Sequence, residues 1–473
     1  MASYLSRENR CLKQLADQVG MTRVLGPSEE GRLALFLVLA RIAHGGSRLS
    51  AVRWAEQHAV SDILGLEQFD ENDLYDALDW LEAEQTRIEK RLYEAYVKDN
   101  GQPPAIVLYD VTSSYFEGEH NELADYGYNR DGKKGKKQIV IGLLTSADGE
   151  PLAVRVFEGN TADPSTVGEQ IDLLKQQFGV SEIVFIGDRG MIKAKGKEAL
   201  GAQGWRYISA LTKQQIRALL KRGVLQPDLF DEDIGEVAQE DKRLIVRRNE
   251  SMQHRERARR ADKLKRLGML IAQRNAFVSQ SKRADAAAGL RQLEQWVKRH
   301  KLNGFVTLSL QQDQIRCQID QEQMAEVALL DGCYVLETTV SAAQMEAQTV
   351  DERYRDLQKV ERGFKTMKTD FLEVRPIFLR NGKRTIAHVF VAMLALKITR
   401  LFQALLHEAF GTTDDDPNAM THKDALQSLA RLTYLIYAVK GTRYARLIQP
   451  DDAQRALLDA LGIRFPRQTA KAL

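Results

Sequence analysis

The sequence predicts an α/β protein in which a mixed sheet with helices follows an all-α N-terminal domain and is interrupted by an insertion domain. Two observations support this fold class. Apolar residues recur at helical spacing through residues 1–100, whereas short apolar runs bounded by glycine, proline and aspartate begin after them. Strands that are followed by helical segments indicate a sheet of the α/β kind.

The first domain, residues 1–100, is expected to be helical. Apolar side chains recur at helical spacing in residues 33–42 and again in residues 74–92, with the breaker Gly45-Gly46-Ser47 between them. A compact helical bundle in this position fits a module that binds DNA ends. It fits a packing or dimerisation bundle equally well, so both interpretations stay open.

The first part of the sheet domain is expected at residues 105–211, after the glycine- and proline-containing break at residues 100–104. Residues 105–109 are typical of a strand buried on both faces, and it ends on Asp110. Residues 182–187 predict a second such strand, which ends on Asp188. Further strands are expected at residues 138–144, 152–157 and 205–211, with a helix after Pro164.

The two aspartates predict a ligand site, because open α/β sheets bind ligands at the carboxyl ends of their strands. Taken singly, each has a plain structural explanation, since aspartate often ends a strand or caps a turn. Asp188 lies in a glycine-flanked turn, between Gly187 and Gly190, which favours a functional role. The pair gains weight from a third carboxylate further along the chain.

That third carboxylate is Glu361, in residues 354–368, which are expected to form one helix. Positions three, four and seven apart share a helix face, so Tyr354, Leu357, Glu361 and Lys368 should point the same way. A hydroxyl, a carboxylate and an ammonium together suit a site for a metal and a phosphate.

A metal at this site follows from electrostatics. Three carboxylates within about 4–5 Å of one another would repel by several kcal/mol per close pair, and a divalent cation removes that cost. Hard oxygen ligands without histidine or cysteine favour Mg²⁺ or Mn²⁺ over zinc.

An insertion domain is predicted at residues 212–330, because far more chain separates Asp188 from Glu361 than one strand and one helix require. Residues 242–301 are strongly charged and are expected to be mainly helical, and residues 305–319 resemble a hairpin. Charge runs are usually solvated helix faces. The alternative is that these lysines and arginines follow a DNA backbone.

The remaining chain completes the sheet domain and adds a tail. A strand at residues 332–338 is expected to return to the sheet, so residues 331–408 form the second part of that domain, including the Glu361 helix. Residues 409–473 are expected to be a helical C-terminal region, with dimerisation as one role.

Composition limits the classes of function. The net charge is +3, so any DNA contact must come from local basic patches rather than from the charge of the whole chain. Cys11, Cys317 and Cys333 lie far apart without metal-type spacing, which suggests a reducing compartment. The longest apolar runs are about half a membrane span, and no apolar signal segment follows Met1. A cytoplasmic protein without a membrane partner is expected.

The motifs resemble those of a known family. Asp110 in Leu-Tyr-Asp-Val-Thr-Ser, Asp188 in Gly-Asp-Arg-Gly-Met and Glu361 in Tyr-x2-Leu-x3-Glu-x6-Lys resemble the acidic triad of bacterial insertion-sequence transposases of the DDE type. The resemblance covers roughly residues 105–400. It implies an RNase H-like catalytic fold and, in one subgroup, an insertion before the glutamate and a Tyr-x2-Arg-x3-Glu-x6-Lys signature. Leu357 stands where that signature has arginine.

The resemblance implies an activity and its partners. Asp110, Asp188 and Glu361 would be the catalytic and metal-binding residues, holding two Mg²⁺ (or Mn²⁺) ions for phosphoryl transfer. The enzyme would cut the terminal inverted repeats of its element and join their 3′-OH groups to target DNA, as a dimer when bound to the DNA ends. It would be cytoplasmic and associated with the nucleoid when bound to DNA. No Walker-type motif is present, and none is required.

Further DNA contacts are expected from the signature helix and from basic residues near the site. Tyr354 and Lys368 would grip phosphates beside the cut, and the alternative is an ordinary helix surface. A lysine-rich loop tip is likewise often only solvated. The other expected DNA-binding residues are Lys365, Arg189, Lys133, Lys134, Lys136, Lys137, Arg375, Arg380 and Arg384.

Two other functions remain open on the sequence. One is a metal-dependent RNase H-like nuclease that cleaves without joining. The other is a non-catalytic DNA-binding protein derived from a transposase. The presence of Asp110, Asp188 and Glu361 argues against a non-catalytic protein. The insertion, with Tyr354 and Lys368, favours a transposase over a nuclease.

Overall fold

The structure is a computed structural model of the whole chain, and it divides into two compact units. The main unit comprises Met1–Arg206 and Arg353–Leu473, and the insertion unit comprises Tyr207–Glu352. Each unit is described by itself. The residues that the structure describes are 3–6, 8–58, 60–118, 120–239, 241–281, 285–368, 372–412, 416, 419–439, 442–447, 449–463 and 471–472.

The main unit begins with the expected helices, which end at a strong break in the chain. A capping box between Asp70 and Asp73 opens the longest of them, α6, and Gly101 ends it with a φ of 74°. Ser28 caps α3 by accepting a hydrogen bond from the Gly31 amide. The helices are α1 (Glu8–Gln18), α2 (Met21–Leu25), α3 (Glu29–Ala43), α4 (Arg48–Glu56), α5 (Val60–Leu64) and α6 (Glu71–Asn100).

A central apolar helix, α15 (Gly382–Phe410), forms the core beneath these helices. It packs on α6, α3 and the sheet strand β4. By length and composition α15 is the one described helix that alone could cross a membrane, yet 72% of its most apolar window is buried inside the protein. The apolar surface of α15 is therefore buried in the core, as in a buried helix of a large domain.

The sheet of the main unit is mixed. Its strands are β2 (Ile106–Tyr115), β3 (Gln138–Ser146), β4 (Pro151–Phe157) and β5 (Val184–Gly187), in the order β4-β3-β2-β5. The first three are antiparallel neighbours, and β5 runs parallel to β2. Every residue of β3 is buried, which explains its nearly continuous apolar sequence. The predicted α/β fold, a mixed sheet with helices after a helical N-terminal region, is confirmed.

Short helical segments connect the sheet strands. After β4 the chain forms a 3₁₀ turn (Asp163–Thr166), α7 (Val167–Asp172) and a π turn (Leu173–Gln177), where one helix was predicted after Pro164. After β5 the helix α8 (Ala194–Ala202) packs on α7.

A buried polar network fastens α6 to the edge strand β4. The Glu89 carboxylate is fully buried and accepts hydrogen bonds from Gln85 (3.0 Å), from the Val154 amide (3.2 Å) and from Arg155 (2.8 Å). Gln177 also donates to Glu89, at 3.2 Å. Because several donors meet this single buried charge, the network fixes the helix on the sheet.

The insertion unit contains its own strands, in the order β6-β11-β8-β7. They are β6 (Arg206–Ala210), β7 (Gly235–Gln239), β8 (Lys242–Arg248) and β11 (Cys333–Thr338), with α9 (Lys213–Lys221) and a 3₁₀ turn (Pro227–Phe230) between them. The prediction of helix from residue 242 was wrong for β8. Leu244, Ile245 and Val246 are fully buried there, and their β propensity outweighs the flanking charges.

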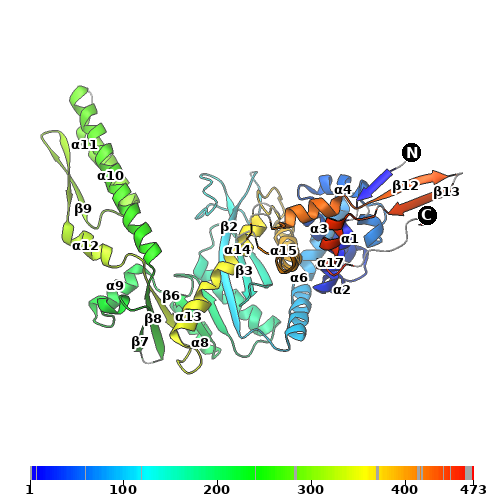
Figure 1. Ribbon diagram of the computed structural model, residues 1–473. Helices are drawn as coiled ribbons and strands as arrows, with labels where there is room; N and C mark the ends of the chain where they lie inside the picture. The colour runs from blue at the N-terminus through cyan, green and yellow to red at the C-terminus, as the bar shows by residue number, and fades with distance from the viewer. Residues whose placement is uncertain are drawn as a thin grey trace. The chain divides into compact units, whose positions relative to one another are not determined.

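The rest of the insertion unit is a pair of helices and a hairpin, with the helices side by side in Figure 1. The helices are α10 (Glu250–Gln280) and α11 (Ala286–Arg299), the hairpin is β9 (Val306–Gln311) with β10 (Gln314–Ile319), and α12 (Gln321–Leu329) follows. The predicted hairpin and the predicted strand at residues 332–338 are confirmed. Leu267, Leu293 and Phe305 belong to the small core that joins these elements.

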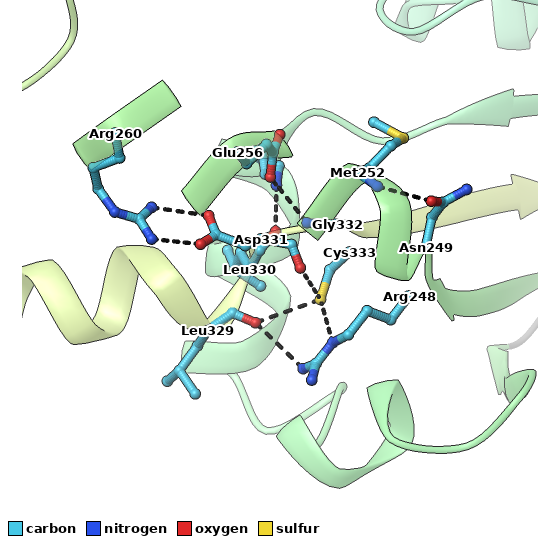
Figure 2. A network of polar contacts seen from close by, with 11 residues as sticks. Arg248, Asn249, Met252, Glu256, Arg260, Leu329, Leu330, Asp331, Gly332 and Cys333 are labelled. Carbon is cyan, nitrogen blue, oxygen red and sulfur yellow. Dashed lines mark hydrogen bonds and ion pairs between the residues drawn. The ribbon is translucent and has the colours of Figure 1, made fainter. Parts of the chain in front are cut away.

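A polar network holds the start of α10 against the chain before β11 (Figure 2). Arg260 donates two hydrogen bonds to Asp331, at 2.9 and 2.5 Å, and Glu256 accepts from the Gly332 amide at 2.9 Å. Gly332 has a φ of 71°, and a Cβ there would overlap the Asn249 carbonyl oxygen, so this crossing requires glycine.

The C-terminal region differs from its prediction. It contains α16 (His422–Ala430), β12 (Thr433–Val439), β13 (Thr442–Leu447), α17 (Asp452–Ala460) and β14 (Lys471–Ala472), whereas a helical region was predicted. The sequence of β12, Thr-Tyr-Leu-Ile-Tyr-Ala-Val, is β-branched and aromatic, which favours a strand. The strand β1 (Ser3–Ser6) pairs with β12, so the N-terminal region is not purely helical.

Candidate active site

Two neighbouring strands bring the predicted aspartates together. The strand β5 runs parallel to β2, with Tyr109 paired to Gly187, so the next residues, Asp110 and Asp188, lie side by side. Asp110 was predicted to end its strand, but β2 continues to Tyr115 through its pairing with β3. Asp188 directly follows β5.

The helix that carries Glu361 is shorter than predicted. The chain forms α13 (Ala347–Arg355) and α14 (Leu357–Lys368) with a break at Asp356, where one helix was expected over residues 354–368. The Asp356 carboxylate is 3.0 Å from Lys359, and this placement of an acid at the start of α14 stabilises a new helix N-terminus.

The break places Tyr354 on α13, whereas Leu357, Glu361 and Lys368 lie on α14. Leu357 is 7% exposed and packs in the core, and Glu361, about one turn further along the same helix, is exposed. The prediction that these four residues belong to one helix was therefore wrong for Tyr354. Leucine suits the buried position that it occupies.

All three carboxylates nevertheless line one pocket of about 380 Å³ in the main unit. The pocket is mixed in charge, with basic side chains from three parts of the chain around the acids. Its lining residues are Asp110, Val111, Thr112, Arg130, Asp163, Asp188, Arg189, Met191, Glu361, Phe364, Lys365, Lys368 and Arg375.

The carboxylates influence one another's protonation. Burial, together with the charges of Asp188 and Glu361, raises the pKa of Asp110 to about 7, against the opposing effects of a hydrogen bond from the Val111 amide and of the Arg130 charge. Burial and the charge of Asp188 also raise the pKa of Glu361. Without a cation in the pocket, Asp110 therefore holds its proton into the neutral range.

The donor chemistry fits a hard divalent cation, because the three groups are carboxylates whose charges oppose one another until a cation compensates them. Among the described residues, no three His, Cys, Asp or Glu side chains are placed to bind a single ion. Asp110, Asp188 and Glu361 line the same pocket, but in this structure they are not gathered closely enough to coordinate one ion.

Tyr354 contacts the site through Asp188. Its hydroxyl donates a hydrogen bond to Asp188 Oδ1 at 3.0 Å. Burial raises the pKa of Tyr354, so the phenol stays a neutral donor. This contact orients a carboxylate of the site, and the predicted grip on a DNA phosphate stays a prediction.

Two of the predicted DNA-binding cations are held by an acid that the sequence did not single out. Asp131 Oδ1 lies 3.0 Å from Lys368 Nζ and 2.5 Å from Arg375 Nη1, and its other oxygen accepts from the Tyr115 amide at 3.0 Å. The Asp131 side chain is only 3% exposed. In the sequence, Asp131 is marked only by its position beside the lysine-rich turn, and that position alone does not indicate a function.

Arg130 is a second pocket residue that sequence reasoning missed. Its guanidinium pairs with Asp163 at 2.6 Å, and its backbone amide donates to Ser113 at 2.9 Å. It lines the pocket with the carboxylates. A single arginine between Asn129 and Asp131 gives no pattern from which its position could be inferred.

The other predicted basic residues divide into three groups. Arg189 and Lys365 line the pocket. The lysines of the turn after Asp131 lie largely at the surface, and one of them, Lys136, pairs with Glu117 at 2.6 Å. The turn lysines are Lys133, Lys134, Lys136 and Lys137.

Two predicted contacts lie outside the pocket lining. Arg384 pairs with Asp79 on α6 at 2.7 Å, and its guanidinium lies 4.9 Å from the centre of the Tyr75 ring. Its charge thus helps to hold α15 on α6. Arg380 is exposed just before α15.

Comparison with known proteins identifies a family. A family model described as "Transposase DDE domain" matches residues 101–398, more than half of the chain. A comparison with curated proteins found no match.

Solved transposase structures show low similarity. A piggyBac transposase synaptic complex with hairpin DNA is 10% identical, with a TM-score of 0.41 over 85% of this chain and 70% of that chain. A Mos1 transposase paired-end complex with the left transposon end is 12% identical, with a TM-score of 0.17 over 38% of this chain and 58% of that one. The match over residues 101–398 places the chain in a family: it belongs to the DDE transposases.

Proposed function

We propose that this chain is the transposase of a bacterial insertion sequence, which cuts the terminal inverted repeats of its element and joins their 3′-OH groups to target DNA. The observation that carries the proposal is the convergence of Asp110, Asp188 and Glu361 on one pocket with a basic rim, in a chain of the DDE transposase family. Phosphoryl transfer requires positioned charge and an oriented nucleophile, and this pocket has groups for both.

The carboxylates are the metal-binding groups of the proposed enzyme. Asp110, Asp188 and Glu361 hold Mg²⁺ or Mn²⁺, because hard oxygen donors are the ligands that these ions prefer. When bound, two such ions supply an activated water and stabilise the leaving 3′ oxygen. The raised pKa of Asp110 supports this assignment, since a nearby cation favours its charged form.

The remaining pocket residues position the carboxylates and the DNA. Tyr354 orients Asp188 by its hydrogen bond. Arg130 and Lys365 line the pocket and bind phosphate oxygens beside the scissile bond. Asp131 fixes Lys368 and Arg375 at the pocket wall, so their charges are in place before DNA arrives.

The proposed chemistry balances without a nucleotide cofactor. In cleavage, a water oxygen bonds to phosphorus while the bond to the 3′ oxygen breaks, and that oxygen leaves as a hydroxyl. In joining, the new 3′-OH bonds to a phosphorus of the target, and a target 3′ oxygen leaves. One phosphodiester bond is exchanged for another. The protein acts in the cytoplasm on the nucleoid, as a dimer that holds two DNA ends.

A nuclease of the same family that cleaves without joining is the second candidate, because the same pocket would hydrolyse a phosphodiester. One experiment separates the two. Purified protein is incubated with Mg²⁺, labelled DNA ends from either border of its coding region and a supercoiled plasmid. Joined products support the transposase, cleavage alone supports the nuclease, and binding without either supports a non-catalytic DNA-binding protein.

The variant Asp188→Ala tests the site itself. It should abolish cleavage and joining while the protein still binds the DNA ends, because the change removes a metal ligand and leaves the basic rim. Cleavage that persists in this variant would sink the assignment of the three carboxylates.

A further inference from the structure

Two tyrosines on the long connection between β2 and β3 are unusually exposed. Tyr126 is 62% exposed and Tyr128 is 81% exposed, and they flank Gly127. We call residues 126–128 the tyrosine loop. Aromatic rings seldom stand this far in water without a partner, because each leaves a large apolar surface hydrated. Their exposure therefore points to a binding surface.

Hydrogen bonds and close packing hold the backbone of the tyrosine loop in place, so the two rings project from a rigid segment. Asp125 and Gln138 exchange two backbone hydrogen bonds, at 3.1 and 2.9 Å. Asn160 donates to the Asp125 carboxylate at 2.7 Å. A Cβ on Gly127 would overlap the carbonyl oxygen of Gly159, so the two glycines let the segments pack directly. Binding on such a surface costs little ordering entropy.

Cations accompany the rings. The Arg130 guanidinium lies 5.7 Å from the centre of the Tyr128 ring, and Lys137 Nζ lies 6.0 Å from that of Tyr126. Lys133 is similarly placed over Tyr115, at 5.6 Å. Aromatic faces interleaved with positive charge are the composition of surfaces that bind unpaired nucleic-acid strands, because the bases stack and the cations meet phosphates.

The tyrosine loop lies beside the candidate active site. Arg130 lines the same pocket as Asp110, and it is also the cation next to the Tyr128 ring. The following residue, Asp131, holds Lys368 at the pocket wall. One side chain thus separates the exposed ring from the place where a phosphodiester would lie.

We propose that Tyr126 and Tyr128 form a stacking platform for an unpaired base next to the phosphate that is cut. The proposal rests on the proposed function, because it takes the DNA end as the ligand of the pocket. It adds a specificity: the protein binds a DNA end with unpaired bases more tightly than the same end fully paired. Stacking is indifferent to base identity, so the preference is for strand separation rather than for a sequence.

The test compares the affinity of the full chain for two mixed-sequence duplexes that differ only in whether one end is unpaired. Wild-type protein should favour the unpaired end. The double variant Tyr126→Ala with Tyr128→Ala should weaken that binding by about 5- to 150-fold for each stacked base lost, and leave binding of the paired duplex unchanged.

Two matched variants separate stacking from other effects. Tyr126→Phe with Tyr128→Phe keeps both rings and should keep the preference, which also shows that the alanine result is not a loss of hydroxyl contacts. Lys134→Ala removes an exposed charge from the neighbouring turn and should weaken both duplexes alike. Thermal unfolding of each variant confirms that it is folded.

The outcomes distinguish this proposal from the proposed function. Equal wild-type affinity for the two duplexes, or equal losses in the alanine variant, overturns the stacking platform even if the DNA ends are cut and joined. A preference that depends on the two rings supports the platform, even if no cleavage occurs and the transposase assignment fails. If the protein binds neither duplex, both the stacking platform and the transposase assignment are overturned.

Discussion

Replacing Asp110 by asparagine should stabilise the protein in the absence of metal. The pKa of Asp110 rises from 3.8 to about 7 on folding, chiefly through burial. The folded state therefore binds more protons than the unfolded state between about pH 4 and 7, and stability falls as the pH rises through that window. One pKa unit corresponds to about 1.36 kcal/mol, so the full cost above pH 7 is about 4 kcal/mol. Asparagine carries no charge, so the variant does not bear this cost.

Urea unfolding of wild-type and Asp110→Asn protein, with metal chelated, measures this difference. The advantage of the variant should be near zero at pH 4 and should grow to as much as about 4 kcal/mol above pH 7. Glu94→Gln, at an exposed carboxylate on α6, serves as the control and should show no such trend. Mg²⁺ should stabilise the wild type and not the variant, because the variant lacks a ligand.

An Asp110→Asn protein that is less stable than wild type at pH 8 without metal would show that the buried Asp110 charge has no such cost. A stability advantage that does not depend on pH would show the same. A stabilised but inactive variant would show that the fold bears a cost for gathering these carboxylates, as expected of a functional site.

Three further variants test named contacts. Tyr354→Phe should slow DNA cleavage roughly tenfold or more in single-turnover assays and leave DNA binding unchanged, since it removes a hydrogen bond to the charged Asp188. Asp131→Asn should lower the free energy of unfolding by about 3 kcal/mol in urea, because two cations lose a buried counter-charge. Arg384→Ala should lower the melting temperature through loss of its pair with Asp79, with DNA affinity unchanged in a filter-binding assay; a large loss of affinity would restore its predicted DNA role.

The sequence identified the acids of the candidate site well, because chemistry and position agree at them. Asp110 and Asp188 follow apolar runs that only buried strands explain, and parallel strands place such residues together. Glu361 lies in a motif with a fixed spacing. The three carboxylates line one pocket, while their metal-binding and catalytic roles stay a prediction.

Helix boundaries were harder to predict from the sequence, because the spacing of apolar residues does not show where a helix breaks. Residues 354–368 have helical spacing throughout, yet the helix is interrupted at Asp356, whose carboxylate pairs with Arg353 and Lys359. Leu357, the first residue after the break, is buried in the core. The position of such a break depends on tertiary packing, which the local sequence does not show.

Charge composition misled the prediction of one strand and did not reveal the long-range ion pairs. Lys242 and Arg243 open a strand whose centre is buried, so their charges hid a β pattern. Arg384 was expected to bind DNA, and that role stays a prediction; its partner in the structure, Asp79, comes from a helix some three hundred residues earlier. Asp131 likewise acquires its role only through long-range contacts with Lys368 and Arg375. No local pattern encodes such pairs.

The pairing of β1 with β12 has a consequence for the order of folding. Ser3 pairs with Ile436, 433 positions further along the chain (436 − 3). Closing so large a loop costs conformational entropy before the pairing contributes any stability, so this sheet should form late, after the elements that lie between the two strands. Until then the β1-facing edge of β12 stays unpaired, and an unpaired strand edge is a site at which chains associate during folding.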